Sequence, residues 1–501
     1  MNLKAKSVAG AKWAAISQIA NQASQLYIGI TLARLLSPDD FGLLGMVFVF
    51  SRFAQVLADM GIGAAIVQRS TIEPKELNSA FWFNAAAGAV LCASLFFAAP
   101  LIAGFYSTPA LTSLARWIAA TFLISSFTIV PTSLMVKDFR FRELAIVETS
   151  SFLTAGVAAI IAAWNGMGVW SLVIQSLVLV AAKLINTFAL SKWRPQLQFE
   201  WNAVKGLFPF SMNLTGAQLI NYWIRNADNL LIGKYLGQGD LGLYTRAYSF
   251  MLMPVRQIST VVTRVMFPAF SSIQDDIPRI RAIYLRTLSV IALMTFPIGL
   301  GLMSVADYFV LGLLGDKWAG MIPILQILCV LSVTQSLGAT AGVIYQSLGR
   351  TDLQLRWAIY SAAIYLSAFV IGLQFGVVGV AAAYMLASVV FMTIPNAMII
   401  GHLTGIKLRE FGGAVAGVFG CAVTMATLVF GLGRVLDGQL EKHWTLLILV
   451  LTGATLYFAL IHVFRIAALR EVRQLVASKL KSDPKSADAA SLDQVPPKSS
   501  Q

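Results

Sequence analysis

The stretch LARLLSPDDFGLLG, residues 32–45, returns in altered form 200 residues later as IGKYLGQGDLGLYT, residues 232–245. Each copy ends an apolar segment, crosses a polar turn and begins another apolar segment. The register holds without a gap over about 35 positions, with identities at Gln18, Asn21, Leu36, Asp40, Gly42, Leu43 and Phe50. Asp40 and Asp240 stand where an N-cap carboxylate would satisfy free amides at the next helix start. The same structural event occurs twice, which predicts an internal two-fold repeat.

The composition excludes a soluble enzyme. Of the 501 residues, 57% are hydrophobic and only 12% are charged, and the mean hydropathy is +0.74. A soluble domain carries about 25% charged residues because water meets its whole surface. The chain is therefore expected to lie mostly in lipid.

Apolar runs long enough to cross a bilayer recur along the chain. A hydrocarbon core of about 30 Å needs roughly 20 helical residues. The runs predict fourteen spans, near residues 12–35, 41–66, 79–104, 110–135, 144–164, 168–190, 207–233, 241–268, 284–312, 319–346, 354–375, 377–400, 411–433 and 443–464. The predicted fold class is an all-α polytopic membrane protein with about fourteen transmembrane helices.

The spans group into two lobes. We expect an N-terminal lobe at 1–190, a cytoplasmic amphipathic linker at 191–206, a C-terminal lobe at 207–400, two extra helices at 401–464, and a basic, then disordered cytoplasmic tail at 465–501. Six spans separate the first from the seventh, so both begin on the same side and the repeat is parallel, about an axis along the membrane normal. Two six-helix bundles around a central cavity form a transporter architecture.

The distribution of Lys and Arg predicts the orientation. The chain carries 37 Lys and Arg against 23 Asp and Glu, a formal charge of +14. Loops on the N-terminal side hold most of these cations, whereas the opposite loops hold only Lys234, Lys317, Arg434 and Lys442. Cytoplasmic loops carry an excess of Lys and Arg. Both termini are therefore expected to be cytoplasmic.

Polar side chains inside the spans concentrate on the first, second, seventh and eighth helices, which the repeat relates. An ionisable group in a membrane is costly unless it faces a cavity or a partner. The candidates for a cationic substrate path are Arg52, Arg225, Arg246 and Arg256. The candidates for ion coupling or ion pairing are Asp59 and Asp228. The candidate cavity-lining amides are Gln18, Asn21, Gln22, Gln25, Gln218 and Asn221. These residues predict a cationic cavity that receives an anionic head group.

Structural roles remain open for several of these residues. Arg225 and Asp228, three residues apart, can form an intrahelical ion pair that only neutralises itself. Arg52 and Asp59 can form a structural bridge, and the amides can join helices. Lys183 lies nearer a span end and is expected to extend toward the interface.

Motifs for resident chemistry are missing from the sequence. It contains no G-x-x-x-x-G-K-[ST] phosphate loop, its three histidines are scattered, and its loops are short for a glycosyltransferase. We therefore predict transport without catalysis, with no metal site and no cofactor other than a coupling ion, H⁺ or Na⁺. No nucleic-acid partner is expected.

Residues 32–45, together with DMGIGAAIVQR at 59–69, resemble polysaccharide flippases of the multidrug/oligosaccharidyl-lipid/polysaccharide exporter superfamily. The similarity is to the Wzx-type branch, which includes the colanic acid and teichuronic acid exporters. The stretch GDLGLYTR at 239–246 resembles the second-half counterpart, and the resemblance extends to about residue 460.

The resemblance implies a MATE-like fold in the bacterial inner membrane and alternating access. It also implies a lipid-linked oligosaccharide substrate, an undecaprenyl-pyrophosphate-linked repeat unit, moved to the periplasmic leaflet for exopolysaccharide, O-antigen or capsule synthesis. The implied partners are a polysaccharide polymerase and a chain-length co-polymerase. The alternative is an ion-coupled exporter of small amphipathic drugs. Such an exporter would need an acidic or aromatic-lined lumen to bind cationic substrates. Arg outnumbers Asp and Glu deep within the predicted spans, which favours the oligosaccharide flippase over the drug exporter.

Overall fold

The computed structural model describes residues 21–59, 62–69, 72–205, 222–223, 225–338, 340–466 and 469. Every regular element in these residues is a helix, and they contain no strand. The predicted all-α class is therefore confirmed.

The first half of the chain is a series of helices at the predicted positions. Residues 21–35 are helical. The following helices are α2 (Pro38–Asp59), α3 (Ile62–Gln68), α4 (Pro74–Tyr106), α5 (Leu111–Ser126), α6 (Ile129–Lys137), α7 (Phe141–Trp164), α8 (Trp170–Leu190) and α9 (Trp201–Lys205).

The second half continues in the same way. Residues 225–235 are helical. They are followed by α11 (Gln238–Ser271), α12 (Ile277–Ser304), α13 (Ala306–Phe309), η1 (Val310–Leu314), η2 (Asp316–Trp318), α14 (Met321–Gly338), α15 (Ala341–Ser347), α16 (Thr351–Leu373), α17 (Gly376–Ala387), η3 (Ser388–Thr393), α18 (Ile394–Thr404), α19 (Leu408–Leu436) and α20 (Lys442–Val463).

Among the described residues, nine helices are long and apolar enough to cross a membrane, or up to ten when one bent pair is counted as a span. The bent pair is α5 and α6, which meet at 42° inside the span predicted at 110–135. Pro131 lacks the N–H that would continue the helical ladder at this break, and the Thr128 hydroxyl donates to the Ser125 carbonyl at 2.7 Å. The chain is a multi-pass membrane protein, and the total of fourteen spans stays a prediction.

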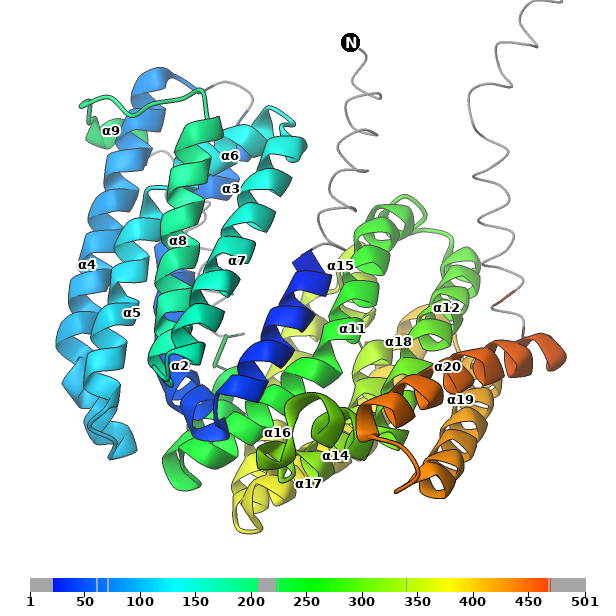
Figure 1. Cartoon of the computed structure of the whole chain (residues 1–501). Helices are drawn as coiled ribbons and strands as arrows, with labels where there is room; N and C mark the ends of the chain where they lie inside the picture. The colour runs from blue at the N-terminus through cyan, green and yellow to red at the C-terminus, as the bar shows by residue number, and fades with distance from the viewer. Residues whose placement is uncertain are drawn as a thin grey trace, which may run out of the picture. The chain divides into compact units, whose positions relative to one another are not determined.

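The chain divides into two compact units, each described by itself. The first contains Met1–Ser249, Phe309–Ile324 and Ala362–Tyr384, and the second contains the remaining segments. In the first unit α7 packs along α8 and α4 packs along α5 (Figure 1). Close approach depends on small residues: a Cβ on Gly88 of α4 would lie 2.6 Å from the Ser126 side chain of α5.

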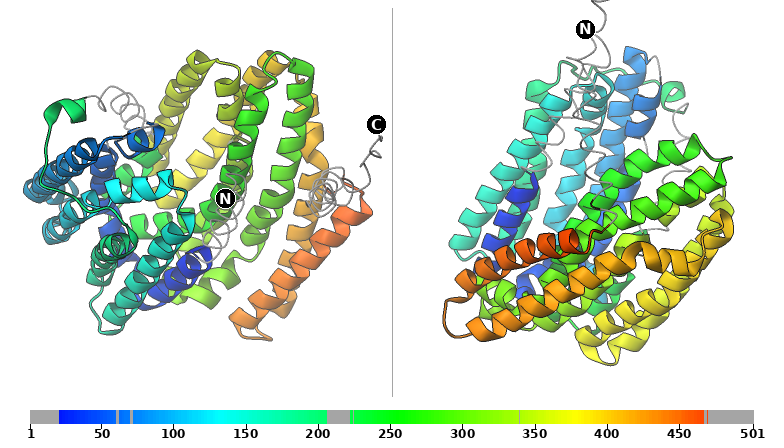
Figure 2. Two further views of the ribbon diagram at one scale, coloured as in Figure 1. Left: turned by 90° about the horizontal axis from the view of Figure 1, so that it is seen from above. Right: turned by 90° about the vertical axis from the view of Figure 1, so that its right-hand side faces the viewer.

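In the second unit, α19 packs against both α12 and α20 (Figure 2). Buried tyrosine hydroxyls join the helices. Tyr457 of α20 donates to the Leu293 carbonyl of α12 at 2.9 Å, and Tyr308 of α13 donates to the Gly433 carbonyl of α19 at 2.6 Å. Each bond satisfies a polar group that would be costly to bury alone.

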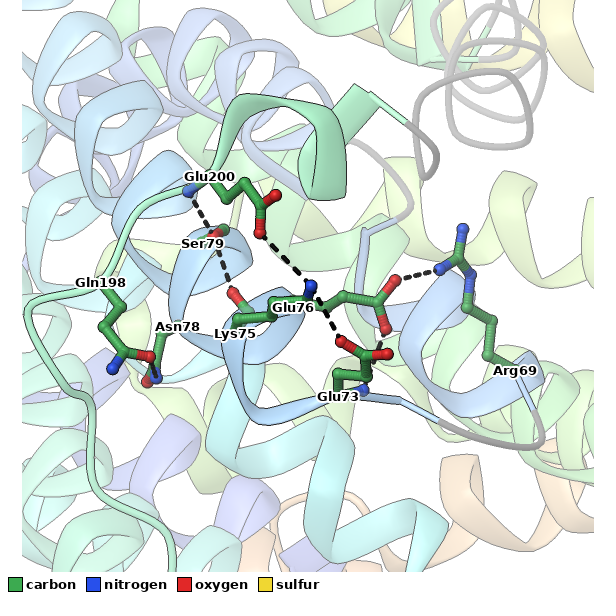
Figure 3. A network of polar contacts seen from close by, with 8 residues as sticks. All are labelled: Arg69, Glu73, Lys75, Glu76, Asn78, Ser79, Gln198 and Glu200. Carbon is green, nitrogen blue, oxygen red and sulfur yellow. Dashed lines mark hydrogen bonds and ion pairs between the residues drawn. The ribbon is translucent and has the colours of Figure 1, made fainter.

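The segment between the two predicted lobes folds back onto the start of α4 (Figure 3). The Gln196 N–H donates to Asn78 Oδ1 at 3.0 Å, and the Glu200 N–H donates to Ser79 Oγ at 2.8 Å. Trp82 Nε1 donates to the Gln196 carbonyl at 2.8 Å. Asn78 and Ser79 are buried. The backbone of the extended chain at 195–200 is thus held by hydrogen bonds to side chains of α4.

Charged side chains surround the same helix start (Figure 3). Arg69 forms an ion pair with Glu76 at 2.7 Å, and Lys75 lies 3.2 Å from Glu73 and 3.7 Å from Glu200. These pairs are partly exposed, so each contributes little to stability by itself. Only the pair between Lys75 and Glu200 joins α4 to the returning segment.

Candidate functional site

The two copies of the repeated turn contact each other within the first unit. A Cβ on Gly42 would fall 1.7 Å from the Gln238 carbonyl oxygen, and a Cβ on Gly242 would fall 1.9 Å from the Pro38 carbonyl oxygen. The two glycines are 200 residues apart, and so are Pro38 and Gln238. The contact is therefore reciprocal, and only glycine allows the backbones of α2 and α11 to approach this closely.

The start of α2 is a reciprocal cap between Ser37 and Asp40. Asp40 Oδ2 accepts from the N–H and the hydroxyl of Ser37, at 2.8 and 2.7 Å, and Ser37 Oγ accepts from the Asp40 N–H at 3.3 Å. The prediction that Asp40 is the N-cap residue is wrong, because α2 begins at Pro38 and Ser37 holds that position. Proline is favoured at the first helical position, since its missing N–H needs no partner there.

Two repeat-related cations bind carbonyl groups near helix ends. Arg34 donates to the carbonyls of Gly312 and Leu313 in η1, each at 2.5 Å. Lys234 donates to the carbonyl of Phe105, near the end of α4. Cations at the C-terminal ends of helices satisfy carbonyls that have no helical partner. Positions 34 and 234 thus have the same structural role.

The short helix η2, which follows η1, forms hydrogen bonds to residues 33 and 34. The fully buried Trp318 donates from Nε1 to the Ala33 carbonyl at 2.8 Å, and Lys317 donates to the Arg34 carbonyl at 2.8 Å. Burial lowers the pKa of the Lys317 ammonium from its ordinary value, and the Asp40 carboxylate opposes this shift. The first copy of the repeated turn is therefore held by hydrogen bonds from Lys317 and Trp318.

Next to this turn, the structure brings together two of the four predicted path arginines. The guanidinium carbon of Arg246 lies 3.7 Å from the Phe41 ring centroid, and that of Arg52 lies 4.9 Å from the Phe48 ring centroid. The two guanidinium groups are near enough to repel each other electrostatically. Arg246 is half-buried, and stacking on an aromatic face offsets part of the cost of burying it, whereas Arg52 is exposed. We call Arg52 and Arg246 the arginine pair.

The second predicted group centres on Asp228, which is 5% exposed. Its carboxylate accepts from the Tyr244 hydroxyl at 2.9 Å and from the Asn229 N–H at 2.7 Å. Among the described residues, no ion pair joins Asp228 to the exposed Arg225. The intrahelical pair that the sequence left open is therefore not formed, because Asp228 has a buried partner on α11 instead.

Further tyrosines surround this carboxylate. The Tyr244 ring stacks on Tyr248 with centroids 6.1 Å apart, and Tyr384 interacts electrostatically with Tyr248 and with Asp228. The Tyr365 ring lies edge-on to Tyr384 at 4.9 Å. We call these four tyrosines and Asp228 the Asp228 cluster. Its tyrosine members were not predicted, because sequence spacing does not show which helices meet.

The remaining predicted residues are not part of either group. Arg256 is exposed and belongs to the second unit. Gln25 is exposed and Gln22 is half-buried, while Asn21 buries its side-chain oxygen without a hydrogen-bond partner. Gln18, Gln218, Asn221 and the side chain of Asp59 lie outside the described residues.

A cavity of about 580 Å³ opens among α2, α3, α5, α6 and α8 of the first unit. Its polar lining includes Gln55, Gln68, Thr128, Thr132 and Lys183. Lys183 was expected to extend toward the interface, but here it lines the cavity. Two sequence signals could have indicated this position. At 1.5 Å per residue, Lys183 lies roughly 20 Å along α8 from the start of that helix. Hydroxyl side chains also recur at helical spacing at positions 125, 128 and 132.

The described residues contain no group of three His, Cys, Asp or Glu side chains that could hold a metal ion.

Comparison with known proteins shows the family. A family model described as "Polysaccharide biosynthesis protein" matches residues 31–323. The chain is 30% identical over 443 residues to the lipopolysaccharide biosynthesis protein WzxC of Escherichia coli (strain K12), covering 88% of this chain and 90% of that protein. It is 30% identical over 459 residues to the teichuronic acid biosynthesis protein TuaB of Bacillus subtilis (strain 168), covering 91% of this chain and 95% of that protein.

Among solved structures, the lipid II flippase MurJ in an inward closed conformation has a similar fold. The TM-score is 0.68 at 14% sequence identity, over 90% of this chain and 98% of that one. At this identity the likeness concerns the fold alone. On the family model and the two relatives, the chain belongs to the polysaccharide biosynthesis protein family, in the Wzx-type branch of the multidrug/oligosaccharidyl-lipid/polysaccharide exporter superfamily.

Proposed function

We propose that the chain is a flippase for lipid-linked oligosaccharides. Its substrate would be an undecaprenyl-pyrophosphate-linked repeat unit, moved from the cytoplasmic to the periplasmic leaflet of the bacterial inner membrane for exopolysaccharide, O-antigen or capsule synthesis. The relatives named for lipopolysaccharide and teichuronic acid biosynthesis support the substrate class. The multi-pass helical fold supports transport rather than catalysis.

The proposed architecture has fourteen spans in two parallel six-helix repeats plus two extra helices, with both termini in the cytoplasm. The reciprocal contact of Gly42 with Gln238 and of Gly242 with Pro38 supports the repeat, because a two-fold axis produces such pairs. The matched roles of Arg34 and Lys234 support it further. Alternating access would then be a rearrangement of two related lobes.

The arginine pair is the observation that carries the proposed substrate class. Two cations near each other repel, so their approach inside a membrane protein is stabilised when an anion lies between or beside them. Arginine remains charged and presents forked donors that match phosphate oxygens. We propose that Arg52 and Arg246 hold the pyrophosphate during passage, with Arg225 and Arg256 as further cations of the path.

The Asp228 cluster is the proposed site of ion coupling. A buried carboxylate whose described partners are hydroxyl and amide donors can take up H⁺ or Na⁺ without breaking an ion pair. In that case Asp228→Asn removes the dependence of transport on the ion gradient, whereas Asn229→Ala, which keeps the carboxylate, retains it. Transport that follows the gradient unchanged in Asp228→Asn would place the coupling site elsewhere.

A deletion strain tests the proposed function. We expect undecaprenyl-linked repeat units to accumulate on the cytoplasmic side and surface polysaccharide to be lost, with both restored by the wild-type chain. Sensitivity to amphipathic drugs with normal polysaccharide would instead support the drug-exporter alternative. A polymerase and a chain-length co-polymerase are the proposed partners, which crosslinking in the complemented strain would capture.

A further inference from the structure

Among the residues that the structure describes, the cavity beside α8 has one charged lining residue, Lys183. The other polar residues of this described lining are amides and hydroxyls, and none is a carboxylate. Across the described residues, no ion pair involves Lys183, although its side chain is half-buried. An ammonium group within apolar helices is costly unless an anion or water balances it. The charge of this cavity therefore suits an anion.

One hydroxyl in the same cavity lacks a hydrogen-bond partner. Thr132 Oγ1 is buried and unpaired. By contrast, Thr128 donates to the Ser125 carbonyl at 2.7 Å, and Ser133 donates to the Ile129 carbonyl at 2.8 Å. A buried hydroxyl without a partner is uncommon in native structures. Thr132 thus lines the same cavity as Lys183 and holds a buried hydroxyl without a partner.

We propose that this cavity is a binding subsite for a phosphate group carried on a lipid. Lys183 supplies the point charge that phosphate binders use, and Thr132 supplies a neutral donor to a phosphate oxygen. A volume of about 580 Å³ accommodates a head group rather than a single ion. The phosphate has two candidate sources, the lipid-linked oligosaccharide and a bilayer phospholipid. The inference rests on the proposed function for the first source alone.

Binding to the purified full-length chain in an uncharged maltoside detergent tests the subsite. The probes are farnesyl pyrophosphate, phosphatidylglycerol and inorganic pyrophosphate, with affinity measured by microscale thermophoresis. We expect Lys183→Met to weaken binding of at least one lipid probe tenfold or more, and Thr132→Val to weaken it a few-fold. Lys183→Arg should stay within about threefold of wild type, because the cation is kept.

Arg116→Met is the matched control. It removes a cation from α5 of the same unit, one that is exposed and stacks on Phe96 at 4.8 Å outside the cavity lining. We expect it to bind all probes like wild type. Wild-type affinity in both Lys183→Met and Thr132→Val, with correct folding shown by size exclusion, would overturn the subsite.

The probes separate the two sources of the phosphate. A tenfold preference for farnesyl pyrophosphate that depends on Lys183 assigns the subsite to the lipid-linked substrate, and equal binding of phosphatidylglycerol assigns it to bilayer lipid. Inorganic pyrophosphate binding as tightly as either lipid would overturn the lipid part of the proposal. Lys183-dependent binding by a chain whose deletion leaves lipid-linked repeat units unchanged would keep the subsite and reject the proposed function.

Discussion

The guanidinium group of Arg246 lies over the ring of Phe41, with its central carbon 3.7 Å from the ring centroid. Phe41 is itself buried and packs against Trp318 at 5.5 Å. The ring therefore covers one face of the cation and stabilises its charge. Arg52 acts electrostatically on the same cation, and in the proposed function the two guanidinium groups share one anionic ligand.

Loss of either cation of the arginine pair should stop export. We expect Arg246→Met and Arg52→Met each to reduce polysaccharide export at least tenfold while the protein still inserts into the membrane. Surface polymer and protein level in the complemented deletion strain measure both effects. Arg434→Met is the control, because Arg434 is an exposed arginine that stacks on Phe430 at 5.1 Å in α19. Normal export in both variants of the arginine pair would contradict the proposed cationic substrate path.

The reciprocal glycine contact should tolerate no side chain. Gly42→Ala and Gly242→Ala place a methyl group less than 2 Å from a backbone oxygen. Because backbone must move to admit it, we expect destabilisation of about 1–3 kcal/mol for each variant. Thermal unfolding followed by size exclusion measures the change. Gly104→Ala, where no atom lies within 4 Å, is the control and should match wild type; equal stability of Gly42→Ala and Gly104→Ala would contradict the close contact.

The hydroxyl of Tyr244 should stabilise the fold through Asp228. Tyr244→Phe leaves the buried carboxylate with one donor fewer, which costs about 1–3 kcal/mol. Tyr235→Phe removes a hydroxyl from a side chain that is 68% exposed, so a change within about 0.5 kcal/mol is expected. Thermal unfolding of the two variants side by side checks the difference, and indistinguishable midpoints would mean that the buried hydrogen bond does not stabilise the protein.

The segment at 195–200 should detach when its anchors on α4 are removed. Asn78→Ala with Trp82→Phe breaks three of its hydrogen bonds, two to Gln196 and one to Gln198. Each lost bond is worth about 1 kcal/mol, so amide exchange at 196–200 should accelerate about tenfold or more, measured by hydrogen–deuterium exchange mass spectrometry. Ser94→Ala, whose exposed hydroxyl donates only to the Val90 carbonyl of its own helix, should leave the exchange unchanged. Slow exchange in the double variant would contradict this attachment.

Helix positions could be predicted closely from the sequence. The span expected at 144–164 is α7, Phe141–Trp164, and the span expected at 443–464 is α20, Lys442–Val463. This agreement has a simple cause, because the thickness of the bilayer determines the length of each apolar run. The sequence does not predict the break between α5 and α6 at residues 127–128, since apolar composition continues across it.

Side-chain partners could not be predicted in the same way. Asp228 has Arg225 as a near neighbour in sequence, yet its partner is Tyr244, 16 residues along the chain. Lys183 is expected at the interface from its position in the span, whereas in the structure it lines a cavity among α2, α3, α5, α6 and α8. Spacing along one helix shows which residues share a face, whereas these contacts depend on which helices meet.

Translocation by the purified chain tests the central claim most directly. Proteoliposomes are loaded with a fluorescent undecaprenyl-pyrophosphate oligosaccharide, and an external glycosidase measures the fraction exposed in the outer leaflet. We predict that wild-type protein makes the inner-leaflet pool accessible and that Arg246→Met proteoliposomes stay near the level of protein-free liposomes. Wild-type proteoliposomes that expose no more substrate than protein-free ones would contradict the account.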